Sequence, residues 1–321
     1  MLFKTVLKKT SALFGAMLIM AGVWCFLHLP GVGLQMVVFA FLSSAALCCT
    51  ADSKVRIGLC CRMVCGAAAA QFLIGITADY PLIRIIAFSL FSFLTLSKMP
   101  DRQCAVIVLI VGCLTLFAPA GLSASLNRCV DLAAAGAAVL LITAVSNAVD
   151  PDFSETPWSE QFYTFRQAAV MTAELSAGFI IFQMFNHEQA AWIMLTILFV
   201  HMAENPQISL STLAEQRITA APLGILAAGM YLCCFGSVNY QMIYIVPFSG
   251  TLCFFMFYLK GNYFIFTFLF MFTMTVFTDW MLGTGNRFHF ADIMLTRCAA
   301  TGIGILLLLG GKNLMQKECV V

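Results

Sequence analysis

Charged residues are scarce in this sequence: they make up 10% of its 321 residues, whereas hydrophobic residues make up 61%. A soluble domain usually carries about 25% charged residues, because water must hydrate its surface. A chain this apolar cannot cover its hydrophobic side chains by folding alone, so we expect lipid to solvate most of its surface. The formal net charge of +2 comes from basic residues scattered along the chain, which argues against a nucleic-acid partner.

The motifs of common catalytic sites are also missing. The sequence has no GxxxxGK[ST] loop, no HExxH and no GxSxG, so hydrolysis of ATP by a P-loop and intramembrane hydrolysis are not expected. His201 and Glu204 lie three residues apart, and two such groups are too few for a metal site. We therefore expect no enzymatic activity, no cofactor and no metal.

Long apolar runs are abundant, and most have about the length that crosses a bilayer as a helix, roughly 17–25 residues. They do not alternate in polarity as barrel strands do. The sequence thus predicts an all-α, polytopic integral membrane protein with about twelve transmembrane helices. The runs are 10–29, 32–51, 57–78, 80–97, 103–119, 126–148, 166–186, 190–204, 214–236, 240–258, 262–282 and 292–311. Three are short enough for a broken or re-entrant helix, namely 80–97, 103–119 and 190–204.

Lysine and arginine predict the orientation, because cytoplasmic loops carry an excess of both. With the N-terminus in the cytoplasm, thirteen of the seventeen basic residues fall in cytoplasmic turns or at cytoplasmic helix ends. Only Arg84, Arg128, Arg287 and Arg297 lie toward the other side. Both termini are therefore expected in the cytoplasm.

The polar stretch 149–165 divides the chain nearly in half, and we expect it to be a cytoplasmic linker. Residues 1–148 and 166–321 would then form two membrane repeats of six helices each. "LNRC" opens the sixth helix and "LTRC" the twelfth, each ahead of a face of small residues. Because six is even, both copies would have the same orientation, as parallel repeats do. Small residues allow close helix packing in lipid, which is the structural reading of 66–70, 133–138 and 302–304.

Two arginine motifs recur in the halves. The first places a small residue four positions and a glycine seven positions after the arginine; Arg217 with Gly224 fits well, and Arg62 fits loosely. The second is Arg-x-x-Asp-x-x-x-small. Arg128 with Asp131 matches it, and the corresponding segment at 297–304 has alanine in place of the acid.

Through these motifs, and through a tryptophan that opens the eighth helix (Trp192), the chain resembles the fusaric acid resistance and aromatic acid exporter family of bacterial inner-membrane proteins. Many members carry a large cytoplasmic domain between the membrane halves, whereas this chain has only a linker and resembles the compact members. The resemblance implies export of aromatic or amphipathic organic acids across the inner membrane, often with a periplasmic adaptor protein. The resemblance does not indicate whether the chain forms a homo-oligomer.

Glu174 is the acid placed deepest in an expected span, eight residues or about 12 Å after Arg166. A charge within the membrane is costly and is a functional hypothesis by default. Glu174 could carry a coupling proton, or it could be a buried acid paired with an arginine. The sequence supports both readings.

Arginines supply the candidate anion-binding residues. Arg128 and Asp131 are one turn apart and could form a structural ion pair. Alternatively Arg128 and Arg297, related by the repeat, could bind a carboxylate near the repeat axis. Arg62 and Arg217 would lie near cytoplasmic helix ends.

Three functions remain open on the sequence. The first is a secondary exporter of organic anions, which is expected to be proton-coupled. The second is a membrane scaffold or assembly component of an envelope complex, against which the small loops argue, because partners need exposed surface. The third is a channel. The thirty phenylalanines could include some that line an aromatic-substrate path, but the sequence does not identify them.

Overall fold

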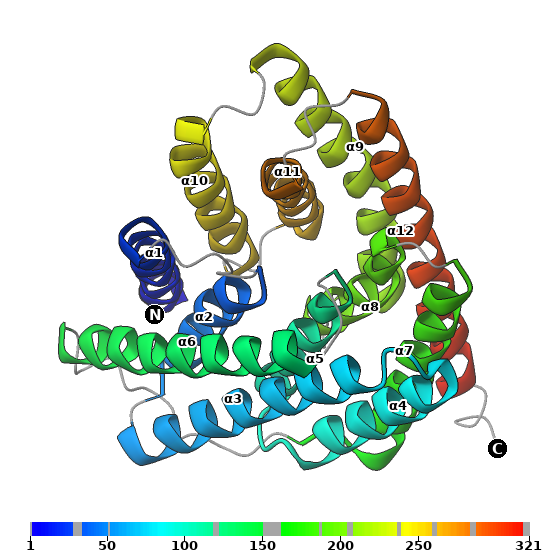
Figure 1. Cartoon of the computed structure of the whole chain (residues 1–321), viewed down its shortest axis with the longest axis horizontal. Coiled ribbons are helices and arrows are strands. Elements are labelled where there is room, and N and C mark those ends of the chain that lie inside the picture. The colour runs from blue at the N-terminus through cyan, green and yellow to red at the C-terminus, as the bar shows by residue number, and fades with distance from the viewer. Residues whose placement is uncertain are drawn as a thin grey trace. The chain divides into compact units, whose positions relative to one another are not determined.

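The computed structural model describes residues 2–27, 34–50, 52–117, 122–149, 162–185, 188–203, 208–235, 239–258, 262–282 and 287–316. Over these ranges the chain is helical and contains no strand (Figure 1). The all-helical expectation is confirmed. Most of the expected linker, 149–165, falls outside the described residues.

Each expected apolar run coincides with one α-helix of the described part of the chain. The helices are α1 Leu2–Leu27, α2 Leu34–Leu47, α3 Ser53–Ile76, α4 Pro81–Lys98, α5 Arg102–Leu114, α6 Leu122–Val149, α7 Phe165–Phe185, α8 Trp192–Ala203, α9 Leu210–Phe235, α10 Asn239–Tyr258, α11 Tyr263–Leu282 and α12 Arg287–Gln316. Two 3₁₀ turns adjoin the short helices: η1, Thr115–Phe117, follows α5, and η3, Glu188–Ala191, precedes α8.

Helix length separates two groups. Among the residues searched, six segments are long and apolar enough to cross a membrane: Ser53–Ile76, Pro81–Lys98, Leu122–Ala148, Phe165–Phe185, Leu210–Phe235 and Ile293–Lys312. The run at 80–97 is therefore long enough. By contrast α5 has 13 residues and α8 has 12, about 20 and 18 Å, which is less than the roughly 30 Å hydrocarbon core. Neither short α-helix would cross the hydrocarbon core alone.

The chain divides into two compact units, Met1–Leu198 and Phe199–Val321, here called unit 1 and unit 2. The boundary falls inside α8. The repeat of 1–148 in 166–321 stays a prediction.

Helix α5 is buried within unit 1, where every residue from Cys104 to Leu114 is buried. It packs against α2, α3 and α4, while α2 and α3 also pack on α6, and α4 packs on α7. A helix that is buried on all sides can be apolar all round, which explains why α5 has no polar face.

Small residues bring α3 close to its neighbours. A Cβ on Gly66 would lie 3.1 Å from Val108 of α5, and one on Gly136 of α6 would lie 2.5 Å from Val64 of α3. The packing role expected for these glycines is confirmed. It does not hold for Gly302 of α12, where a Cβ would meet no described atom within 4 Å.

The C-terminal end of α5 tightens into η1, and a side chain compensates for the lost helical hydrogen bond. The N–H of Thr115 donates to the carbonyls of Gly112 and Cys113 instead of continuing the α-helical pattern to Val111. The fully buried Gln71 of α3 donates from Nε2 to the Val111 carbonyl at 3.4 Å. Gln71 thus joins α3 to the end of α5, next to a 3₁₀ turn that contacts η3.

Unit 2 is built around α9 and α11. Helix α9 packs against α11 and α12, and α10 packs against α11. The two helix backbones lie close together at Gly224 of α9, where a Cβ would overlap the backbone carbonyl oxygen of Phe268 on α11. Only glycine allows this backbone contact, so the position fixes the spacing of the two helices.

Candidate functional site

Arg217 is the eighth residue of the 26-residue helix α9, and its side chain is fully buried in unit 2. A guanidinium cannot lose its proton under ordinary conditions, so burial leaves a positive charge inside an apolar helix bundle. Such a charge is costly unless it is paired or serves a ligand.

The contacts of Arg217 occupy only one edge of its guanidinium. Nη1 donates to the hydroxyl of Tyr263, the first residue of α11, at 3.3 Å. Nε and Nη2 have no hydrogen-bond partner among the described residues. These two N–H groups point the same way along one edge of the fork, which is an edge that a carboxylate can bind with both oxygens.

Aromatic rings gather beside this guanidinium. Its Cζ lies 5.6 Å from the centre of the Phe199 ring, in the second half of α8. Phe199 is 4.5 Å from Phe270 between ring centres, and Phe266 is 5.5 Å from Tyr263 and 4.8 Å from Phe257. We call the following set the aromatic cluster: Phe199, Phe254, Phe257, Tyr263, Phe266 and Phe270.

Unit 2 thus combines a hydrogen-bond donor for an anion with a group of aromatic rings. The guanidinium offers a charged, bidentate donor edge, and the cluster offers aromatic faces and edges from α8, α10 and α11. Aromatic rings prefer offset or edge contacts with other rings at about 4.5–7 Å. A small anion that carries its own ring would satisfy both parts.

Arg297 is a second buried arginine in unit 2, with 1% of its surface exposed. Its Nη1 donates to the hydroxyl of Thr275 on α11 at 3.0 Å. Tyr263 and Thr275, which anchor the two arginines, are twelve residues apart, about 18 Å along α11. Unit 2 therefore holds two buried arginines that contact α11 at positions about 18 Å apart.

Glu174 is buried in unit 1, with 5% of its surface exposed, and is the tenth residue of the 21-residue helix α7. It lies near the middle of a helix long enough to cross a bilayer. Around it α7 is fixed to α4: Ser176 and Ser89 hydroxyls are 2.7 Å apart, and the rings of Phe179 and Phe88 stack at 4.6 Å.

The remaining candidates lie in unit 1. Arg128 and Asp131 of α6 are both half-buried, and Arg128 Nη2 donates to Ser125 Oγ at 3.2 Å. Arg62 is exposed on α3. Arg128 and Arg297 belong to different units, so their approach to a common axis stays a prediction, as does the Arg128–Asp131 pair.

The aromatic cluster is not apparent in the sequence, which has thirty phenylalanines and no motif that singles out the members of the cluster. Tyr263, the first residue of α11, is 5% exposed and accepts a hydrogen bond from Arg217. Trp192 opens α8, as expected, and is buried.

Comparison with known proteins gives one match. Residues 176–310 match the family described as fusaric acid resistance protein-like, which confirms the resemblance seen in the motifs for this part of the chain. The matched range contains Arg217, Arg297 and the aromatic cluster, and it begins two residues after Glu174. No curated protein and no solved structure matches the chain. With its apolar helices of spanning length, the chain is a multi-pass membrane protein.

Proposed function

Since residues 176–310 match the fusaric acid resistance protein-like family, we propose that the chain exports aromatic carboxylates and similar amphipathic acids across the bacterial inner membrane. The observation that carries the proposal is the buried Arg217, whose Nε and Nη2 lie without a described partner beside the aromatic cluster. A carboxylate neutralises the guanidinium, and the substrate ring replaces contacts among the phenylalanines.

Energy coupling and partners belong to the same proposal. A proton gradient would drive export, with Glu174 as the proton-carrying residue, because it is a buried acid near the middle of a helix of spanning length. Both termini would lie in the cytoplasm, and a periplasmic adaptor protein, or a second copy of the chain, would complete the path. Arg297 would be a second anion position, further from Tyr263 along α11.

A matched pair of ligands tests binding directly. The purified chain should bind benzoate and larger aromatic carboxylates more tightly than the corresponding uncharged amides. Arg217→Gln should weaken carboxylate binding by about 30-fold or more, because removing one side of a buried charge pair costs roughly 2 kcal/mol or more. Lys54→Gln, which removes an exposed basic residue from α3, is the control. Equal binding of acid and amide would contradict the proposed site.

Transport is tested in cells. Strains that lack or overproduce the chain should differ in tolerance to a panel of aromatic acids and dyes. Identical tolerance across the panel, with the protein shown in the membrane, would remove the export proposal and favour the scaffold alternative.

A further inference from the structure

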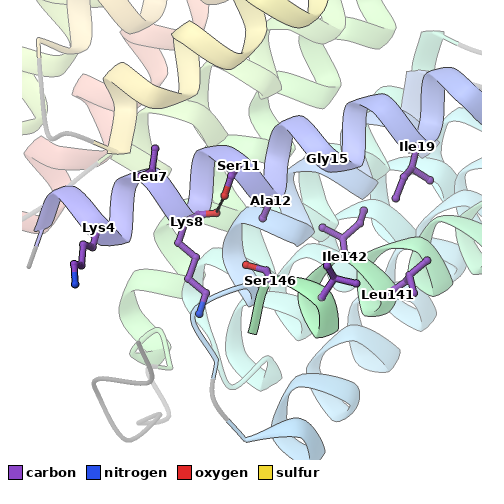
Figure 2. A pocket seen from close by; sticks show the side chains of 11 residues that line it. Lys4, Leu7, Lys8, Ser11, Ala12, Gly15, Ile19, Leu141, Ile142 and Ser146 are labelled. Atoms are coloured by element: carbon purple, nitrogen blue, oxygen red, sulfur yellow. Dashed lines mark hydrogen bonds between the residues drawn. The ribbon is translucent and has the colours of Figure 1, made fainter. Parts of the chain in front are cut away.

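A groove of about 640 Å³ runs between α1 and α6 on unit 1 (Figure 2). One end is basic and polar. Lys4 and Lys8 leave the same side of α1, one turn apart, and Ser146 of α6 lies toward this end. Lys4 is exposed, whereas Lys8 is buried with 8% of its surface accessible, so this end of the groove encloses a lysine.

The rest of the groove is apolar. Small residues of α1, Ala12 and Gly15, line the middle of the groove. The side chain of Ile142 lies 4.0 Å from a Cβ placed on Gly15. Ile19 and Leu141 line the end opposite the lysines (Figure 2). The exposed aliphatic side chains and the missing bulk at Gly15 leave room for a flexible hydrocarbon.

The dimensions match a lipid in one leaflet. From Ser11, beside the lysines, to Ile19 is eight residues, about 12 Å along the helix. One leaflet contributes about 15 Å of hydrocarbon, half of the roughly 30 Å core. The lysines lie at the N-terminal end of α1, where the excess of lysine and arginine predicts the cytoplasmic surface, and basic pockets between helices on that side attract anionic headgroups.

We propose that the groove between α1 and α6 is a binding site for an acidic phospholipid, with the phosphate headgroup at Lys4 and Lys8 and an acyl chain along Gly15, Ile19 and Leu141. A zwitterionic lipid would gain less from the two ammonium groups, because its own cation offsets the charge of its phosphate. A soluble anion would leave the apolar length empty. Arg217 does not line the groove, and the proposal does not depend on which solute the chain transports.

Native mass spectrometry of the full chain in detergent tests the site, with phosphatidylglycerol and phosphatidylcholine of identical acyl chains as probes. The wild-type chain should retain phosphatidylglycerol preferentially. The double variant Lys4→Gln, Lys8→Gln should lose about 30-fold in affinity, as expected for two lysine contacts with an anionic lipid. Gly15→Phe, which fills the groove, should reduce binding of the same lipid with both lysines intact.

Two control variants make the result specific to the groove. Lys54→Gln removes an exposed lysine from α3, and Gly58→Phe adds a ring where a Cβ meets nothing within 4 Å. Neither should change lipid retention. Unchanged binding in both Lys4→Gln, Lys8→Gln and Gly15→Phe would overturn the proposal, as would an equal loss in Lys54→Gln. If the double variant fails to fold, Lys4→Gln alone, at an exposed position, must still lower phosphatidylglycerol retention. Competition by glycerol 3-phosphate at the lipid's own affinity would also overturn it, because the acyl chain would then contribute nothing.

Discussion

At the residue scale, Arg217 is unusual for a buried cation because one edge of its guanidinium, formed by Nε and Nη2, has no hydrogen-bond partner among the described residues. The hydroxyl of Tyr263 accepts from Nη1 only, so under the proposed function the shape of the guanidinium, as well as its charge, would matter for binding a planar carboxylate. A lysine at this position would supply the positive charge but not the two parallel N–H donors of a guanidinium.

Arg217→Lys should therefore keep the chain folded and in the membrane while weakening aromatic carboxylate binding by about ten-fold, the loss of one of two parallel hydrogen bonds. Isothermal titration with benzoate on the purified variant measures the change. Wild-type affinity in the lysine variant would mean that a point charge suffices and that the open edge has no role.

Glu174 offers a second residue-scale prediction. Glu174→Gln keeps size and most hydrogen bonds but abolishes titration, and the Ser176–Ser89 and Phe179–Phe88 contacts of α7 do not involve the carboxyl. Assembly should be normal, and proton-driven efflux from vesicles should fail. Glu215→Gln, an exposed acid on α9, is the matched control and should transport normally. Normal efflux by Glu174→Gln would make Glu174 a structural acid.

The sequence could identify Arg217 and Glu174, because a charge inside an apolar run is visible in one dimension. It could not identify Phe199, Phe266 or Tyr263 among so many aromatic residues. Their grouping depends on α8, α10 and α11 meeting in space, and helical periodicity says which face a residue shares but not which helix covers that face.

At the element scale, the spacing of α9 and α11 depends on the absence of one Cβ. Gly224→Ala should destabilise the chain by about 1–3 kcal/mol despite the better helix propensity of alanine, because a methyl group would displace the Phe268 backbone. The same change at Gly302 of α12, which faces open space, should be neutral or slightly stabilising. Thermal unfolding of both variants in the same detergent measures the difference. Equal transition temperatures would show that α11 shifts without cost.

The short helices α5 and α8 could be predicted in part from the lengths of their apolar runs. The apolar runs at 103–119 and 190–204 were too short for confident spans, and the structure contains short α-helices there with 3₁₀ turns at one end. The contact between η1 and η3 could not be predicted, because it joins segments about seventy residues apart.

At the scale of the whole molecule, the orientation is testable without a structure. Reporter fusions at Pro100, Pro157 and Asn262 should read cytoplasmic, because lysine and arginine concentrate on that side. Fusions at Ser123, His187 and Thr284 should read periplasmic. A periplasmic signal at Pro157 would break the two-repeat hypothesis, since each half would then have an odd number of crossings.

Local contacts agree with this orientation. Arg102, at the start of α5, donates to the carbonyl of Phe162, just before α7, and Lys312 near the end of α12 donates to Ser211 at the start of α9. Each pair joins segments that the basic-residue pattern assigns to the cytoplasmic side. The helix number and approximate bounds could be predicted from hydropathy alone, whereas the repeat could not be established from such short motifs.

The buried charge of Arg217 has an electrical consequence. If a carboxylate neutralises it, the loaded carrier moves no net charge at this site, while the empty carrier returns with a positive charge inside the membrane. Moving one elementary charge across a membrane potential of 100 mV changes its energy by about 2.3 kcal/mol. Voltage would therefore change the rate of the empty return step and leave the loaded step almost unaffected. Turnover at saturating substrate should then vary with voltage, and currents recorded from Arg217→Gln should lose that dependence.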